Sequence, residues 1–138
     1  MSTPEAITYN PRSLPLPRRL LVRAAVAVGH LLAAQPPRRI RRVLGWLGRR
    51  AEPATLDEAK EAREAVVAVS LACAGHEGCL VRSIATVLLC RVRGKCVTWC
   101  VGVRRLPPFG AHAWVEVNGT PVGEPYPPDY FRKFFTVQ

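Results

Sequence analysis

The spacing of the apolar residues changes once along this chain, at Gly94. Between Arg18 and Gly94, apolar residues recur every three or four positions, which is the period of amphipathic helices. In the next segment, "KCVTWCVGVR" (95–104), valine and tryptophan alternate with polar or small residues, as in a strand with one buried face. Helices that come first and antiparallel strands that come second predict an α+β fold.

Local signals set the limits of the predicted elements. We expect helices over residues 18–34, 37–47, 55–73 and 79–93, strands over residues 95–104 and 111–117, and a third strand after a turn at Asn118 and Gly119. Thr55 and Glu58 have the spacing of a capping box at the start of the third helix. The tail "PYPPDYFRKFFTVQ" is broken by prolines and then aromatic.

Basic residues are distributed unevenly along the 138-residue chain. The formal net charge is +10, and many of the arginines lie in the first fifty residues. Among them are Arg18, Arg19, Arg23, Arg38, Arg39, Arg41, Arg42, Arg49 and Arg50. Because no zinc finger or RNA-binding aromatic signature accompanies them, we expect these arginines to bind an acidic protein or peptide rather than nucleic acid.

The cysteines and the N-terminus indicate a reducing compartment. The chain has five cysteines, and "MSTPEAITYN" lacks the basic start and apolar run of a secretion signal. We therefore expect reduced thiols and a cytoplasmic location. The longest apolar segment, residues 20–34, contains Arg23 and His30 and is too short to span a bilayer. A packed helix is expected there rather than membrane association.

Cys79 has the position of a catalytic nucleophile. It follows Gly78 and begins the fourth predicted helix. The free N–H groups and the dipole of a helix N-terminus stabilise a thiolate, and the backbone N–H of the same residue can hold an oxyanion. Taken alone, a cysteine at a helix start is more often a small buried residue, so the assignment needs a histidine partner.

Of the three histidines, His112 is the best partner for the thiol. It begins the strand "HAWVEV", on a sheet against which the helix of Cys79 would pack. His76 lies in the loop before that helix, and His30 lies within the first helix, where we expect a structural or surface role. A zinc alternative combines Cys73, His76 and Cys79, but their spacing differs from the paired Cys-x2-Cys of common structural sites.

A carboxylate should orient the imidazole, and the register of the hairpin decides which one can. A three-residue loop at 117–119 would place His112 opposite Glu124, with their Cβ atoms about 5 Å apart. A two-residue turn at 118–119 would send Glu124 to the other face. The catalytic interpretation therefore predicts the bulged hairpin. Glu116 is the rival carboxylate, on the His112 face but about 13 Å along the strand.

The segments "GCLVRSIATVLLCRVRG", "VGV" and "AHAWVEVNGTPVGE" resemble the leader peptidase of lasso-peptide biosynthesis, a family of the transglutaminase-like/papain-like cysteine protease superfamily. The resemblance covers residues 55–125. It implies Cys79 as the nucleophile, His112 as the general base and acid, and Glu124 as the acidic third member, where relatives often have aspartate. We expect Arg82 to help shape the substrate site and Trp114, mostly a core residue, to line it as well. The family needs no metal or other cofactor.

The resemblance implies an activity and its partners. The protein would cleave the leader from a ribosomally made precursor peptide, and a separate ATP-dependent cyclase would then close the ring on the freed core. A chain of this length has no room for a leader-recognition domain, so that domain is expected as a separate protein. We expect residues 1–54 to form a basic helical segment that docks the partner or precursor. Residues 55–138 would form the transglutaminase-like core, with the nucleophile helix packed on a small antiparallel sheet.

Two alternatives remain. A protease-like scaffold would bind partner and precursor through its basic helices and would turn over nothing. An acyltransferase of the same superfamily would pass the acyl group to an amine rather than to water, and the mass of the product would show the difference.

Overall fold

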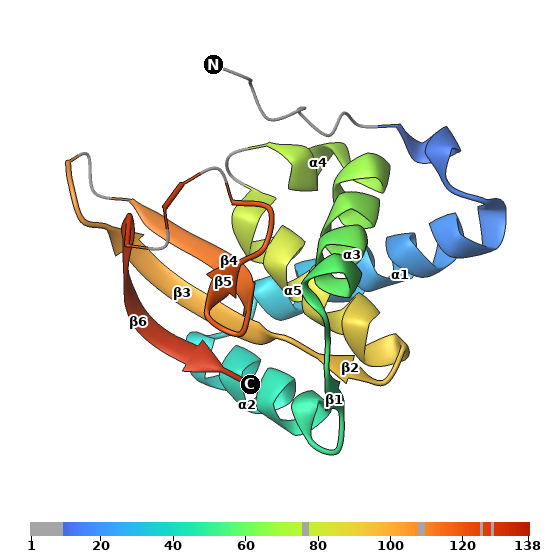
Figure 1. Cartoon of the computed structure of the whole chain (residues 1–138). Helices are drawn as coiled ribbons and strands as arrows, with labels where there is room; N and C mark the ends of the chain where they lie inside the picture. Colours follow the sequence, from blue (N-terminus) through green and yellow to red (C-terminus); the bar gives the residue numbers. More distant parts are fainter. Residues whose placement is uncertain (1–9, 76–77, 108–109, 125, 128) are drawn as a thin grey trace.

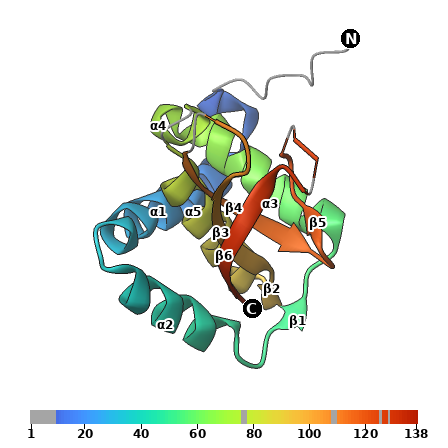
Figure 2. The ribbon, with the colours of Figure 1, turned by 90° about the vertical axis from the view of Figure 1, so that its left-hand side faces the viewer.

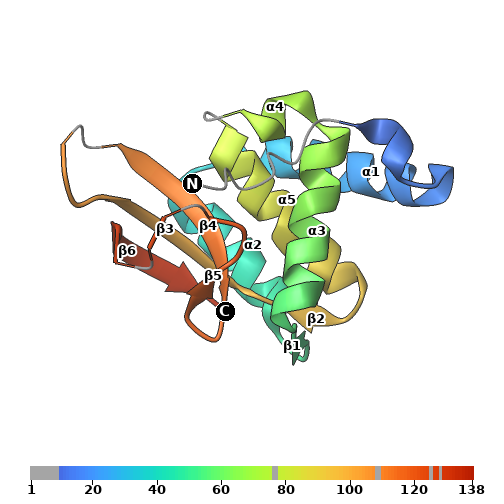
Figure 3. The ribbon, with the colours of Figure 1, turned by 45° about the horizontal axis from the view of Figure 1, so that its top comes forward.

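The structure, a computed structural model of the chain, describes residues 10–75, 78–107, 110–124, 126–127 and 129–138. It has two layers, because the helices gather on one side of a small antiparallel sheet (Figure 1). Figure 3 shows the same two layers from above, with the antiparallel sheet on the left and most of the helices on the right. The predicted α+β fold is confirmed.

Helices form wherever the spacing predicts one. They are η1 (Pro11–Ser13), α1 (Leu16–Ala33), α2 (Pro37–Gly48), α3 (Leu56–Val69), α4 (Leu71–Ala74) and α5 (Cys79–Val92). The third predicted helix is divided, because the backbone of Ser70 is extended and its hydroxyl caps α4 by accepting a hydrogen bond from the N–H of Cys73. Helices α1 and α3 and the sheet all pack against α5. None of the described helices is long and apolar enough to cross a membrane.

The start of α3 is stabilised by a reciprocal pair of hydrogen bonds. The Thr55 hydroxyl accepts from the N–H of Glu58 at 3.2 Å, and the Glu58 carboxylate accepts from the N–H of Thr55 at 3.0 Å. This is the capping box that the sequence predicts. It gives partners to N–H groups that have none within the helix.

The main sheet has four strands in the order β5-β4-β3-β6. They are β3 (Thr98–Arg104), β4 (Ala111–Val117), β5 (Thr120–Pro121) and β6 (Phe131–Val137), and β1 (Glu52–Pro53) pairs separately with β2 (Lys95–Cys96). The spacing of apolar residues did not predict β6, which pairs antiparallel with β3. Most residues of this edge strand are exposed or half-buried, so its sequence lacks a clear alternation of apolar and polar residues.

Apolar residues cover both faces of the sheet. The main cluster of buried residues includes Val22 of α1, Leu44 of α2, Val66 of α3, Ile84 of α5 and Trp99 of β3. A smaller cluster contains Cys100, Trp114 and Phe131, with Tyr126 and Tyr130 packed against it. Figure 2 shows α1 running directly beside α5. The helices before residue 54 therefore share one core with the later elements, and the functional division at that residue stays a prediction.

Replacing Thr55 with alanine removes the capping hydroxyl of α3. We expect the free energy of unfolding to fall by about 1 kcal/mol, because the N–H of Glu58 loses its acceptor. Lys60→Ala, at an exposed position of the same helix, is the control and should change stability by less than about 0.5 kcal/mol. Urea unfolding followed by circular dichroism measures both variants. Equal losses in the two would contradict the role of the cap.

Candidate active site

Helix α5 begins at Cys79, the predicted nucleophile, and Gly78 precedes it as the N-cap. The Cys79 side chain is half-buried. At Gly78 there is no room for a side chain, because a Cβ atom there would lie 2.1 Å from the carbonyl oxygen of Ala72 and 2.8 Å from the Cα of Cys73. Glycine at this position lets α4 pass directly against the start of α5. The thiol is thereby held at the positive end of the α5 dipole.

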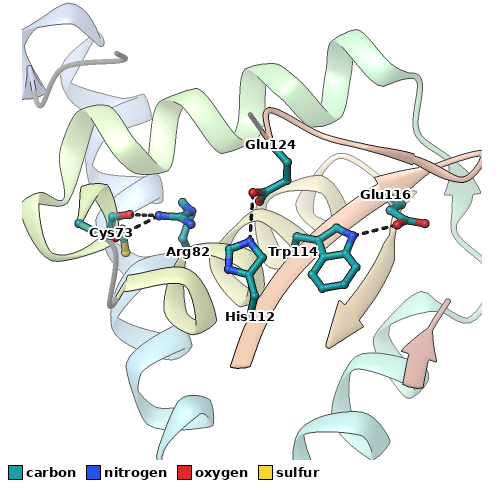
Figure 4. Close-up of polar contacts among 7 residues, drawn as sticks. Cys73, Arg82, His112, Trp114, Glu116 and Glu124 are labelled. Atoms are coloured by element: carbon teal, nitrogen blue, oxygen red, sulfur yellow. Dashed lines mark hydrogen bonds and ion pairs between the residues drawn. The ribbon is translucent and has the colours of Figure 1, made fainter. Parts of the chain in front are cut away.

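Arg82 holds the same junction from within α5. Its Nη1 group donates to the carbonyl of Cys73 at 2.8 Å and to that of Gly75 at 3.3 Å (Figure 4). The side chain is buried, and both acceptors lie at the C-terminal end of α4, where a cation is electrostatically favourable. Arg82 therefore supports the turn that leads into α5. Direct contact of Arg82 with a substrate stays a prediction.

His112 lies near the start of β4, and its ring is held by three neighbours. Its Nε2 atom lies 3.0 Å from Oε2 of Glu124, and the ring stacks on Phe131 and Trp114 with centroid distances of 4.6 and 5.6 Å. Figure 4 shows the imidazole between Arg82 and Trp114. Glu124 contacts the ring on the side that points away from the His112 backbone. Because the carboxylate engages Nε2, Nδ1 is the nitrogen left for the thiol.

The register of the hairpin differs from the predicted one. Strands β4 and β5 pair at Val117 and Thr120, so the turn consists of Asn118 and Gly119 alone. Both turn residues have positive φ, 51° and 78°, as a two-residue type I′ turn requires. The predicted three-residue loop is therefore wrong, because Asn-Gly closes the hairpin without an extra residue.

Glu124 nevertheless reaches His112, because the chain bends at Gly123. The pairing with β4 continues to Val122, whose N–H donates to a carbonyl of that strand at 2.9 Å. Gly123 then takes a φ of +65°, which breaks the alternation that would have sent Glu124 to the other face. A Cβ at Gly123 would also lie 2.9 Å from the side chain of Arg63. An isolated glycine near the end of a strand was the signal for this bend, and the sequence analysis missed it.

Glu116, the rival carboxylate, has other partners. It is 2% exposed, and it accepts hydrogen bonds from Nε1 of Trp114 at 2.8 Å and from Nζ of Lys133 at 2.7 Å. Lys133 belongs to β6, so the sequence analysis had no partner to offer for Glu116. Of these two carboxylates, Glu124 is the one in contact with His112. Its role as the third member of a triad stays a prediction.

The thiol and the imidazole change each other's pKa. Burial by itself would raise the pKa of Cys79. A hydrogen bond with His112, another from the N–H of Ala113 and nearby positive charges outweigh burial, so this pKa is lowered from 9.0. Burial would also lower the pKa of His112, but hydrogen bonds with Cys79 and Glu124 and their negative charges raise it to about 9. Both shifts favour a thiolate beside an imidazolium.

Other cysteines lie in environments that disfavour a thiolate. Burial raises the pKa of Cys73, that of Cys90 to about 11 and that of Cys100 to about 12. Cys79 is therefore the thiol that should react first near neutral pH. In the described part of the chain, no group of three or more His, Cys, Asp or Glu side chains is placed to hold a metal ion. His76, which the zinc alternative requires, lies outside the described residues.

A cavity of about 300 Å³ lies beside the imidazole. Its walls come from several elements and include Arg63, Gly75, Arg82, His112, Glu124 and Phe131. Trp114 is 3% exposed and packs against the ring of His112 and that of Phe131. Its observed contacts support the imidazole, and a contact with substrate stays a prediction.

Comparison with known proteins identifies a family. A family model described as the transglutaminase-like superfamily matches residues 22–136. The matched segment begins within α1 and ends within β6, so it contains Cys79, His112 and Glu124. No curated protein and no solved structure gives a significant match.

Replacing Gly123 with alanine tests whether the bend holds Glu124 against His112. The variant combines a positive φ with a contact between its Cβ and Arg63, so we expect Glu124 to move and the pKa of His112 to fall from about 9 toward its ordinary 6.5. Gly119→Ala is the matched control, since Gly119 has a φ of +78° but no atom within 4 Å of its Cβ position. NMR titration of the ring protons measures both variants. An unchanged pKa in Gly123→Ala would contradict the role of the bend.

Proposed function

Because the chain belongs to the transglutaminase-like superfamily, we propose that it is a cysteine endopeptidase that cleaves the leader peptide from a lasso precursor. The observation that carries the proposal is one imidazole in contact with the Glu124 carboxylate, together with pKa shifts that favour a thiolate at Cys79 and an imidazolium at His112. In this proposal Cys79 is the nucleophile, His112 transfers the proton and Glu124 orients His112.

The reaction starts from the thiolate–imidazolium pair. The Cys79 sulfur attacks the carbonyl carbon of the scissile peptide bond, and the backbone N–H of Cys79 donates to the developing oxyanion. His112 gives its Nδ1 proton to the leaving nitrogen as the C–N bond breaks, which leaves a thioester. His112 then accepts a proton from water while the water oxygen attacks the thioester carbon. The C–S bond breaks, and the product acid and the thiolate form.

Glu124 acts in this scheme by holding the ring rather than by taking a proton. Its contact with Nε2 of His112 keeps Nδ1 directed at the sulfur, and Phe131 and Trp114 stack on the ring. A ring held in this way serves both proton transfers without a large reorientation. The negative charge of Glu124 also stabilises the imidazolium that the first step consumes.

The proposal names leader peptides as the substrate, and the sequence supports this more specific assignment. The segments that contain Cys79 and the His112 hairpin resemble the leader peptidases of lasso-peptide biosynthesis. Cleavage would free the N-terminus of the core peptide, and an ATP-dependent cyclase would then join that amine to an acidic side chain. A leader-recognition protein would deliver the precursor. These partners are proposed from the resemblance.

The groove between α1, α2 and α5 is the docking surface in this proposal. It has a volume of about 800 Å³, and its walls include Leu21, Leu88 and Trp46, the last of which is 66% exposed. Arg49 and Arg50, both exposed, line the same groove. A leader-recognition protein that presents apolar side chains together with carboxylates would match this surface.

Replacing Cys79 with alanine removes the nucleophile, and we expect cleavage of the precursor to fall by about 10³-fold or more while the fold is kept. The assay incubates a candidate precursor with the protein, with and without the leader-recognition protein, and measures products by mass spectrometry. Cys96→Ala, which changes a half-buried thiol outside the site, is the control.

Each outcome of this assay separates the candidate functions. Cleavage that survives in Cys79→Ala would exclude the proposed enzyme. Binding of precursor and partner by the wild type without any turnover would favour the scaffold. A product that gains the mass of an amine rather than that of water would indicate an acyltransferase.

The pH profile of kcat/KM should be bell-shaped. As the pH falls through the lowered pKa of Cys79, the thiolate is protonated and the rate falls. As the pH rises through about 9, His112 loses the proton that the leaving amine needs, and the rate falls again. Glu124→Gln removes a charge that stabilises the imidazolium, so the alkaline limb should move to lower pH. An alkaline limb that stays in place would contradict the role of Glu124.

A further inference from the structure

The cavity beside His112 carries an excess of positive charge that the three catalytic groups do not use. Arg63 of α3, Arg82 of α5 and Arg104 at the end of β3 all line it. Glu124 is the only carboxylate among the described residues that line the cavity, and it is in contact with His112. We propose that this cavity binds a carboxylate of the substrate next to the scissile bond. The inference rests on the proposed peptidase function and names the substrate class at that site.

Arg63 carries the strongest argument. Its side chain is half-buried and lies against Gly123, where a Cβ would be 2.9 Å from Nη1. Within the described residues, no carboxylate forms an ion pair with Arg63. Burial and the positive charge of Arg82 both lower the pKa of Arg63, while the charge of Glu124 raises it. Two guanidinium groups in one small cavity are stabilised when an anion joins them.

Arg82 and Arg104 add further donors to the same wall. Arg82 uses Nη1 for the carbonyls of Cys73 and Gly75, which leaves the N–H groups of Nε and Nη2 for a ligand. The guanidinium carbon of Arg104 lies 5.9 Å from the centre of the Tyr130 ring, so an aromatic face supports it. The paired donors of a guanidinium match the two oxygens of a carboxylate, which favours this anion over a neutral amide.

The position of the cavity defines which part of the substrate enters it. His112 and Gly75 line the cavity, and His112 and Cys79 shift each other's pKa. The scissile carbonyl has to lie at the sulfur, so the group that reaches the cavity belongs to a residue beside the scissile bond. A volume of about 300 Å³ holds a single acidic side chain or a chain terminus.

Two small alkylating agents test the charge preference without a peptide substrate. The Cys79 thiolate attacks the methylene carbon of iodoacetate or iodoacetamide, a C–S bond forms and iodide leaves. The two reagents have similar size, but only iodoacetate carries a carboxylate. The quantity measured is the ratio of their rate constants at Cys79, iodoacetate over iodoacetamide. It is compared for the wild type and for Arg63→Gln and Arg104→Gln.

Arg23→Gln, at an exposed position of α1 outside the cavity, is the matched control with the same change in net charge. We expect the ratio to fall about fivefold or more in each cavity variant and by less than about twofold in the control, because the field of a distant surface charge is screened. The iodoacetamide rate of each variant shows whether its thiolate still forms. Arg104→Gln decides the question if Arg63→Gln does not fold.

The outcomes separate this inference from the function on which it rests. Ratios that are equal in all four proteins, or that fall as much in Arg23→Gln, overturn the carboxylate site while the peptidase proposal stands. A Cys79 that reacts no faster than the other thiols with either reagent overturns the peptidase proposal itself.

Two pairs of peptides identify the source of the carboxylate. The first pair has glutamate or glutamine beside the scissile bond and amidated C-termini, and the second pair is neutral with a free or amidated C-terminus beside that bond. A higher kcat/KM for glutamate assigns the cavity to an acidic side chain, and a higher value for the free terminus assigns it to a chain end. The preference should shrink about fivefold or more in Arg63→Gln or Arg104→Gln. No preference within either pair overturns the inference.

Discussion

Strand β5 pairs with β4 only near the turn, at Val117 and its neighbours, and the structure describes no strand on the rest of this edge of β4. The backbone N–H of Ala113 lies on that edge, and its interaction with the Cys79 thiolate helps to lower the pKa of this thiol. A longer β5 would take this N–H for its own ladder and would hold Glu124 on the face away from His112. The bend at Gly123, just after β5, therefore leaves the N–H of Ala113 to Cys79, the predicted nucleophile, and creates the contact that holds the imidazole.

Burial and nearby charges together set the pKa of several thiols, and the balance between them differs from one cysteine to the next. At Cys90 and Cys100 burial raises the pKa, and at Cys100 the nearby Glu116 raises it further. At Cys79 the imidazole and a backbone N–H supply partners for the charged form, and the pKa falls despite burial. A helix N-terminus alone would not make this difference, because the hydrogen bonds come from β4. The lowered pKa of Cys79 therefore depends on the contact between the two layers.

Local chemistry made part of this structure predictable. The capping box at Thr55, the start of α5 and the strand that carries His112 all follow from spacing and turn residues a few positions apart. Features that depend on pairing between distant segments were missed, above all β6. This edge strand is largely exposed, so its sequence shows no regular alternation of apolar and polar residues. The hairpin register was wrong for a different reason. A three-residue loop was expected to bring Glu124 to His112. The structure makes the same contact by a bend at Gly123, which lies after a two-residue turn.

Helix α5 connects the two surfaces on which the proposals depend. Cys79 is its first residue, and Leu88 and Val92 near its other end line the groove that α1 and α2 complete. Helix α1 lies close to α5, since a Cβ at Gly29 would be 3.4 Å from the Val81 side chain. A partner in the groove would thus touch the helix that begins with Cys79, and binding to the folded form would stabilise the packing of α1 against α5. The positive charge is divided in the same way. Arg49 and Arg50, which follow α2, line the groove, and Arg63, Arg82 and Arg104 line the cavity beside the imidazole. In our proposals these two groups of arginines would bind two acidic ligands at separate sites.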